Sequence, residues 1–188
     1  MINESYKGKL LISSPEISDG IFDKSTILIC EHDAKGTMGF IVNKPLIDVN
    51  IETIWKNLGY EKKSPYFDNK DVLIGGPLAS NAMFVVHSPE YFIDKKTIKV
   101  CEEICLTGTK EITDDIQKEQ GPRKALFLLG YSGWIQGQLE DEIMRDSWFV
   151  SEKVEDLIFR NNYQSKWADA LSLIGIDPSK LSFYAGSS

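Results

Sequence analysis

Short runs of apolar, often β-branched residues recur along the chain, each bounded by glycine, proline or polar residues. Runs of this length and composition are typical of β-strands. The polar loop between the second and third runs, residues 32–37, contains Gly36 and indicates a hairpin. We therefore predict strands at residues 9–13, 26–31, 38–43, 71–74, 83–87, 97–106 and 125–129.

In other segments the apolar residues recur every three or four positions, which predicts amphipathic helices. Asn50 and Gly59 bound the first of these segments, as an N-cap and a helix stop. The others cover residues 138–148, the segment after Ser151 and the segment before Gly175, with a shorter helix expected after Thr109. The core is expected to include Trp55, Leu58, Leu126, Leu128, Trp167 and Leu171.

The order of these elements bears on the fold class. Strands dominate the first half of the chain and helices the second, with one helix inserted early. This order lacks the regular strand–helix alternation of a parallel α/β protein. It favours an α+β domain with a mixed or mainly antiparallel sheet. Because the 188 residues contain no internal repeat or Pro/Gly-rich linker, we expect residues 1–188 to form a single domain.

The charge balance narrows the expected partners. The chain has a formal net charge of −7, whereas nucleic-acid binding depends on Lys and Arg that neutralise phosphates. Direct DNA binding and binding to an anionic membrane are therefore not expected. No run approaches the ~20 apolar residues of a membrane helix, and the N-terminus lacks the pattern of a secretory signal. We expect a cytoplasmic protein.

Three cysteines, Cys30, Cys101 and Cys105, fit a reducing compartment. The last two have C-x-x-x-C spacing, not the C-x-x-C of redox and zinc sites. If residues 97–106 form one strand, the α-carbons of Cys101 and Cys105 lie ~13 Å apart, too far for a disulfide. We expect all three thiols to stay reduced, unreactive and free of metal.

The most conspicuous motif is residues 130–142, GYSGWIQGQLEDE, which follows an apolar strand and leads into a helix. It resembles a nucleophile elbow around Ser132, but Trp134 stands where G-x-S-x-G needs its second glycine. Both histidines also precede Ser132, unlike the histidine of that hydrolase class. Acidic residues at the helix start disfavour an anion site. We interpret the segment as a tight turn, with Tyr131 and Trp134 in the core or in an interface.

Further candidate residues lie where predicted strands end. His32 and His87 could each act as a base or a metal ligand, but no recognised metal spacing supports this. A hydrogen-bonded structural histidine is favoured for each. The Gly-Gly-Pro sequence at 75–77 could approach a ligand closely or only turn the chain. Lys44 could bind an anion, although an ordinary solvated lysine is the simpler interpretation.

Four blocks of the sequence, in this order, resemble the YqgE/AlgH family of bacterial proteins. The first is GKLLIS at residues 8–13, and the second is CEH at 30–32 with GTMGFIVNKP at 36–45. The third is GGP at 75–77 with FVVH at 84–87, and the fourth is GYSGW at 130–134 with GQLE at 137–140, Glu142 and Trp148. The match covers essentially the whole chain.

This resemblance implies an α+β fold with a branched, partly barrel-like sheet flanked by helices. It implies no established activity, substrate or cofactor. One branch of the family carries the label of transcriptional regulator, which no helix-turn-helix pattern or basic surface supports here. Ser187 stands where the family tends to have a histidine, so a site that needs that histidine is in doubt in this chain.

Three functions follow as hypotheses. The favoured one is a non-enzymatic regulatory or interaction protein, because no catalytic constellation is complete. The alternatives are an enzyme or small-ligand binder, and a DNA-binding regulator. We assign no catalytic residue, metal ligand or cofactor. We expect a protein or small-molecule partner and leave homo-oligomer formation open.

The candidate binding residues are predicted to come together on one face. If the strands before His32, Gly75 and Tyr131 share a sheet and run in the same sense, their ends meet, and a pocket can form there. The candidate binding residues are His32, Asn43, Lys44, Gly75, Gly76, His87, Tyr131, Ser132, Trp134, Gln138, Glu140 and Glu142.

Overall fold

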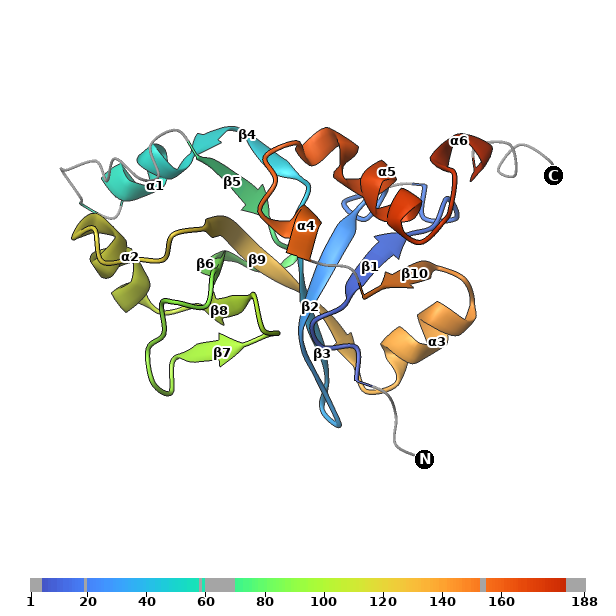
Figure 1. The fold of residues 1–188 in the computed structure, drawn as a ribbon, viewed down its shortest axis with the longest axis horizontal. Coiled ribbons are helices and arrows are strands. Elements are labelled where there is room, and N and C mark those ends of the chain that lie inside the picture. Colours follow the sequence, from blue (N-terminus) through green and yellow to red (C-terminus); the bar gives the residue numbers. More distant parts are fainter. Residues whose placement is uncertain (1–4, 19, 58, 60–69, 153–154, 182–188) are drawn as a thin grey trace.

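The computed structural model describes residues 5–18, 20–57, 59, 70–152 and 155–181. Figure 1 shows a curled sheet with helices around it. The strands are β1 (Leu10–Ser13), β2 (Thr26–Asp33), β3 (Gly36–Ile41), β4 (Pro45–Asn50), β5 (Asp71–Ile74), β6 (Leu78–His87), β7 (Thr97–Lys99), β8 (Cys105–Thr107), β9 (Ala125–Ile135) and β10 (Trp148–Ser151). The helices are α1 (Ile51–Asn57), α2 (Lys110–Gln117), α3 (Gln138–Met144), α4 (Glu155–Ile158), α5 (Tyr163–Leu173) and α6 (Pro178–Leu181).

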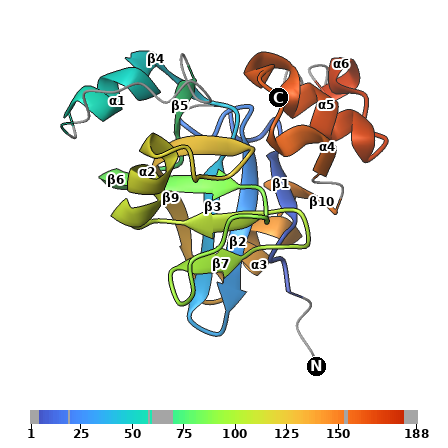
Figure 2. The same cartoon turned by 60° about the vertical axis from the view of Figure 1, so that its left-hand side comes forward.

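Strand β9 joins the two halves of the sheet. The strands follow the order β10-β1-β2-β3-β9-β6-β8-β7, and β5 also pairs with β9 and carries β4. The first half of β9 pairs on one side with β5, in parallel, and on the other side with β6, antiparallel. The second half pairs with β3, antiparallel. The sheet therefore branches along β9, and Figure 2 shows β7, in one branch, running across the direction of β2 and β3 in the other.

The branch point depends on glycines. Because β5 and β6 lie on opposite sides of β9, the segment between them must cross β9. A Cβ on Gly76 would lie 2.2 Å from the carbonyl carbon of Tyr131, and one on Gly75 would lie 2.2 Å from the Gly130 carbonyl oxygen. Gly130 itself has φ +71°, a conformation that strongly favours glycine. The two segments of the chain can therefore cross only where glycines keep side chains out of the contact.

The helices cover the sheet on several sides. Helix α5 contacts β1 and β2 and has α4 and α6 beside it, whereas α3 contacts β9 and β10. Buried apolar residues form three clusters, one beneath α5, one around Trp55 and Phe127, and one around Trp134, Leu139 and Trp148. No helix in the described part of the chain is long and apolar enough to cross a membrane.

The predicted α+β class with a branched, mainly antiparallel sheet is confirmed by this arrangement and by its likeness to a solved structure described below. Of the predicted core residues, Trp55, Leu126, Leu128 and Leu171 are buried. Trp167 is partly buried and its Nε1 donates to the Ser13 carbonyl, 2.9 Å away. Leu58 and Ser187 lie outside the described residues.

Two predictions of local structure were wrong in an informative way. The predicted strand 97–106 is a hairpin of β7 and β8, because the chain reverses at the exposed pair Glu102-Glu103. The assumed ~13 Å spacing of Cys101 and Cys105 therefore does not apply. The segment 130–142 was interpreted as a tight turn before a helix, but residues 130–135 continue strand β9 and the chain turns only at Gly137. The glycines in that stretch of β9 serve close chain packing within a strand, whereas composition alone indicated a chain reversal.

Two element boundaries were also misplaced. The strand predicted at 38–43 ends at Ile41, and Pro45 begins a further strand, β4, that was not predicted. Strand β4 has a single partner, β5, and proline is tolerated on such an outer strand, where its missing N–H leaves no ladder bond unmade. Helix α3 ends at Met144, and Trp148 begins β10. The intervening Asp146 has φ +59°, which breaks the helical conformation.

Candidate functional site

The candidate site is built at the corner where β9 leads into α3 and the chain returns as β10. Gly137, with φ +79°, makes the turn from strand to helix. Leu139 is fully buried and anchors α3 against the sheet beside Trp134 and Trp148. Glu142 lies three residues after Leu139 and so on the same side of α3, facing the tryptophans, and Gln138 lies one turn before Glu142.

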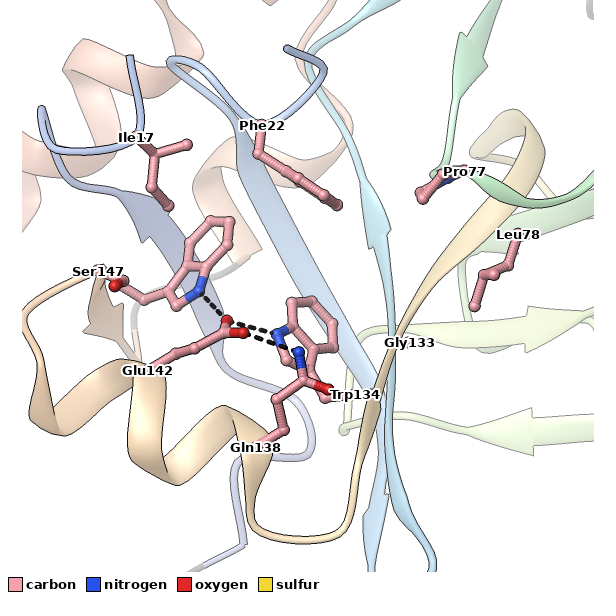
Figure 3. Close-up of a pocket in the computed structure, with 10 residues that line it drawn as sticks. Ile17, Phe22, Pro77, Leu78, Gly133, Trp134, Gln138, Glu142 and Ser147 are labelled. Atoms are coloured by element: carbon pink, nitrogen blue, oxygen red, sulfur yellow. Dashed lines mark hydrogen bonds between the residues drawn. The ribbon is translucent and has the colours of Figure 1, made fainter. Parts of the chain in front are cut away.

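Glu142 is the centre of a hydrogen-bond network at this corner. Its Oε2 accepts from the indole Nε1 of Trp134 and of Trp148, at 2.8 Å in each case. Its Oε1 accepts from Gln138 Nε2 at 2.8 Å. The two indole rings meet edge to face with centroids 6.1 Å apart. The network fixes the carboxylate between two aromatic side chains, as the dashed lines in Figure 3 show.

A cavity of about 430 Å³ opens next to this network, and we call it the tryptophan hollow. Its walls are mostly apolar or aromatic, and the Glu142 carboxylate is its charged group. A carboxylate oxygen has about two acceptor positions, so Oε1 retains one for a ligand. The tryptophan hollow is lined by Ile17, Phe22, Pro77, Leu78, Gly133, Trp134, Gln138, Glu142, Ser147 and Trp148 (Figure 3).

A second cavity, of about 570 Å³, lies along the second half of β9, and we call it the edge hollow. Leu78, Gly133 and Trp134 line both this cavity and the tryptophan hollow. The edge hollow adds charged residues from the β2–β3 hairpin. It is lined by Glu31, Asp33, Lys35, Gly36, Thr37, Met38, Leu78, Tyr131, Gly133, Trp134 and Ile135.

His32 lies at a third cavity, of about 430 Å³, between the β2–β3 hairpin and the start of α3. Its Nδ1 is 2.8 Å from Thr37 Oγ1, and its Nε2 is 3.5 Å from Glu140 Oε1. The Tyr6 ring packs edge to face on the imidazole. His32 thus ties the hairpin to α3 at the rim of the site, and Asp33 and Asp141 add to the acidic character of this cavity.

The structure brings the predicted strand ends to one part of the sheet but divides the candidate residues between its two faces. His32 stands opposite Thr37 and Thr37 opposite Trp134, whereas Tyr131 lies on the other face. Strands β2, β5 and β9 run in the same sense, since β5 is parallel to β9 and two antiparallel steps through β3 relate β2 to β9. Gly76 packs on the Tyr131 backbone. Tyr131 in turn lines the edge hollow together with Glu31 and Asp33, the neighbours of His32. The shared-face hypothesis rested on this strand orientation.

Other candidate residues hold the framework next to the site. Asn43 accepts from the Thr26 amide and donates to the Lys24 carbonyl, and Lys44 donates to the Asp23 carbonyl. These contacts fix the loop before β2. Ser132 is buried and its Oγ donates to the Gly75 carbonyl at 3.2 Å. Its hydroxyl is therefore directed into the sheet crossing and not toward either histidine.

His87 lies apart from the other candidates, fully buried in the other half of the sheet. Its Nε2 is 2.9 Å from Thr107 Oγ1, and Thr107 Oγ1 is 2.8 Å from Thr97 Oγ1. Its Nδ1 is 2.9 Å from the Ser88 carbonyl. Burial lowers the pKa of His87 below its ordinary value. The favoured interpretation of His87 as a structural, hydrogen-bonded histidine agrees with these contacts.

The cysteines lie away from the hollows and are free thiols. Cys30 and Cys105 are buried, and desolvation raises the pKa of both thiols. A raised pKa disfavours the reactive thiolate. Among the described residues no cluster of three or more His, Cys, Asp or Glu could hold a metal ion. Their reduced, metal-free state stays a prediction.

The sequence-based site omitted the other side of the tryptophan hollow. Trp148 and Phe22 are in edge-to-face contact, with ring centroids 5.9 Å apart, yet neither was a candidate. Trp148 was recognisable, because it falls within the family-like block after Glu142. Phe22 and Ile17 come from the loop between β1 and β2, and no local pattern predicts that this loop folds over α3.

Taken together, the fold and site define an α+β protein with a branched sheet and a built cavity at the strand–helix corner. The chain belongs to the AlgH-like family (DUF179), whose family model matches residues 10–179. A UPF0301 protein of Ruegeria pomeroyi is 40% identical over 179 residues, which cover 95% of this chain and 97% of that protein. A UPF0301 protein of Bradyrhizobium diazoefficiens is 38% identical over 185 residues, covering 95% and 86%.

Solved structures show the same fold. The solution structure of the AlgH protein from Pseudomonas aeruginosa matches with a TM-score of 0.78 at 25% identity, over 100% of this chain and 98% of that one. The crystal structure of protein DIP2367 from Corynebacterium diphtheriae matches with a TM-score of 0.75 at 21% identity, over 98% and 94%. The predicted resemblance to the YqgE/AlgH family is thereby confirmed.

Proposed function

We propose that this protein is a non-enzymatic, cytoplasmic interaction protein that binds its partner at the tryptophan hollow. One observation carries the proposal: the Glu142 carboxylate is held by three N–H donors at the wall of an apolar cavity. Such a network is rigid before any ligand arrives, and preorganisation of this kind favours binding. Apolar walls with a few fixed polar groups are typical of binding pockets.

The neighbouring residues favour binding over catalysis. A nucleophile needs a base within hydrogen-bond reach, but the Ser132 hydroxyl is bonded to a backbone carbonyl. His32 contacts Thr37 and Glu140, and His87 is enclosed in the core. None of these side chains is placed to activate another. A regulator that acts by direct DNA binding is less favoured, because the site faces acidic residues and the net charge is −7.

The proposal is tested by NMR with phenethylammonium as a probe, which joins an aromatic ring to a cation. We expect the indole N–H signals of Trp134 and Trp148 to shift, with a dissociation constant in the millimolar range or below. Trp55, a buried residue of α1 in a different cluster, is the internal control. The variant Glu142→Gln should weaken binding at least tenfold. If a broad set of aromatic and aliphatic fragments leaves both indole signals unmoved, the tryptophan hollow is not a binding site.

A further inference from the structure

The second half of β9 has a free edge. The order β3-β9-β6 places β3 on one side of β9 and β6 on the other. Pairing with β6 reaches only to Leu78 opposite Tyr131, whereas pairing with β3 continues to Ile135. Within the described part of the chain, no strand pairs with β9 on the β6 side between Ser132 and Ile135. Figure 3 shows Gly133 on this stretch of β9.

The backbone groups of Gly133 are directed toward that free edge. A Cβ on Gly36, in the paired strand β3, would lie 2.3 Å from the Trp134 carbonyl oxygen, so the Trp134 carbonyl faces β3. Backbone groups of successive strand residues point to opposite edges. The N–H and C=O of Gly133 and the C=O of Ile135 therefore point outward. The Ile135 N–H is bonded to Gln138 Oε1 at 3.1 Å, as expected for a group on the outer edge.

The two hollows flank this edge on opposite faces of the sheet. Alternate residues of a strand lie on opposite faces, so Trp134 faces the tryptophan hollow, and Tyr131, Gly133 and Ile135 face the edge hollow. This agrees with the lining of the edge hollow, where Met38 and Gly36 stand opposite Gly133 and Ile135 in the β3–β9 ladder. A strand added at the edge would direct its side chains alternately into the two hollows.

The chemistry of the two faces differs and indicates which side chains fit each. The tryptophan hollow offers Phe22, Trp148 and Leu78 to an apolar side chain. The edge hollow presents Glu31 and Asp33, both exposed, in a protein with net charge −7. Although Lys35 also lines it, acidic groups outnumber basic ones, and Glu140 and Asp141 lie across the hairpin. Charge complementarity therefore favours basic side chains on this face.

Natural proteins usually protect a free edge with charged side chains, proline or a covering segment. Here the residues with outward-pointing backbone groups are Gly133 and Ile135, and Ile135 is 76% exposed. Gly133 adds no side chain to this edge, and a Cβ there would lie 2.9 Å from Leu78 Cδ1, the movable end of that side chain. An unprotected edge with a hollow on each side is the geometry of strand addition by a peptide.

We propose that β9 binds an extended segment of a partner protein by strand addition, at the Gly133 edge. The segment alternates basic side chains, over the edge hollow, with apolar side chains, in the tryptophan hollow. The proposal rests on the proposed binding function of the tryptophan hollow and names the class of its partner. Main-chain hydrogen bonds would supply affinity, and the two hollows would supply specificity.

The test uses the peptide acetyl-Gly-Lys-Phe-Lys-Val-Lys-Gly-amide and the full-length protein. Two N-methylated versions carry the methyl groups either on the Phe and Val amides or on the amides of the Lys residues before them. In a strand these two sets of N–H groups point to opposite edges. We expect one version to bind at least tenfold more weakly and the other to bind within about twofold of the parent. If both N-methylated peptides bind as tightly as the parent, or if both bind much more weakly, strand addition is wrong.

Sequence controls separate pairing from general attraction. A peptide of the same composition with its lysines in a block should bind at least fivefold more weakly, and a version with Glu for Lys should not bind. Ile135→Lys should weaken binding at least tenfold, whereas Ile47→Lys, at the 86% exposed residue of β4, should not change it. Indifference to the order of the peptide or to Ile135→Lys would overturn the proposal.

The failure of this inference can be told apart from failure of the proposed function. If phenethylammonium shifts the Trp134 and Trp148 indole signals but no peptide does, the hollow binds ligands and strand addition is wrong. If neither does, both proposals fail. A second copy of the chain is the other candidate to occupy the edge, and sedimentation at high protein concentration tests for such a dimer. A dimer that Ile135→Lys dissociates, without peptide binding, would assign the edge to a second copy of the chain and overturn the proposal.

Discussion

The two halves of β9 belong to one strand but have different surroundings. Residues 127–129 pair with neighbours on both sides, and next to Ala125 His87 is buried with all its polar contacts satisfied. Residues 132–135 pair on one side only, and the Glu142 network beside them opens onto a cavity. In both networks each side-chain oxygen or nitrogen of the central residue has a hydrogen-bond partner, so hydrogen bonding alone does not mark a functional site. What distinguishes the second half is access to an unpaired edge and to two hollows.

The largest effect is expected where the two halves meet. In Gly76→Ala the new Cβ would lie 2.2 Å from the Tyr131 backbone, which no rotamer change can relieve. We expect a loss of about 3 kcal/mol or more in the free energy of unfolding, measured by urea denaturation. Gly59→Ala is the matched control, because that glycine also has positive φ but has nothing near its Cβ. Equal losses in both variants would show that backbone conformation, and not the crossing, requires Gly76.

In the half of the sheet that contains β6, His87→Ala should destabilise the protein without affecting peptide binding. The change leaves a cavity and removes one partner of the Thr107 hydroxyl, which keeps Thr97, and the side-chain partner of the Ser88 carbonyl. We expect a cost of about 3–4 kcal/mol in unfolding free energy. Loss of peptide affinity in the protein that remains folded would contradict the separation of the two halves.

The same histidine predicts a pH dependence of stability. Its pKa is lowered in the folded protein, so between that value and the ordinary value of about 6.5 the unfolded chain binds more protons. Stability should therefore fall as the pH falls below about 6.5, by about 1.4 kcal/mol for each unit of pKa difference. Urea unfolding between pH 7.5 and 5 measures this. His87→Gln should flatten the profile in that range, and an unchanged profile would assign the effect to other groups.

Beside residues 132–135 of β9, Glu142→Gln should lower the free energy of unfolding less than it weakens peptide binding. The amide can still accept from one indole, and water in the hollow can reach the other, so we expect a loss of about 1–2 kcal/mol in unfolding free energy. Binding of the alternating peptide should weaken at least tenfold, measured by titration calorimetry. The conservative control Glu140→Gln removes charge at the His32 cavity and not from the tryptophan hollow. A larger loss of binding in the control would move the site toward His32.

The smallest effect on stability is expected from Ile135→Lys. The side chain is on an exposed edge, where substitutions usually change the free energy of unfolding by less than about 0.5 kcal/mol. Its effect should appear in binding alone. A marked stability loss would mean that Ile135 packs in solution and that the edge is covered.

The sequence predicted the features that arise from local pattern. Apolar periodicity located the buried strands, α1 and the helix at Gln138, and the family-like blocks predicted the α+β fold with its branched sheet. The same pattern misassigned glycines. Gly130 and Gly133 were interpreted as a turn, because the reason for a glycine, such as the approach of Gly76 to Tyr131, involves a chain segment distant in sequence.

The site was predicted in part for the same physical reason. Trp134, Gln138 and Glu142 lie on a strand end and one helical turn, so local spacing placed them together. Their third partner, Trp148, and the covering Phe22 reach the hollow through tertiary packing. The free edge of β9 could not be predicted at all, since it depends on where β6 stops pairing, at Leu78.

Hydrogen exchange at the Gly133 amide tests the central claim most directly. With the alternating peptide at saturation, strand addition should slow exchange of this amide at least tenfold, while amides in residues 127–129, already paired on both sides, should be unchanged. The same amide should exchange as in the free protein when the inactive N-methylated peptide is added. If the alternating peptide shifts the Trp134 and Trp148 indole signals but leaves Gly133 exchange unchanged, the ligand enters the tryptophan hollow without pairing with β9, and the account of the free edge is wrong.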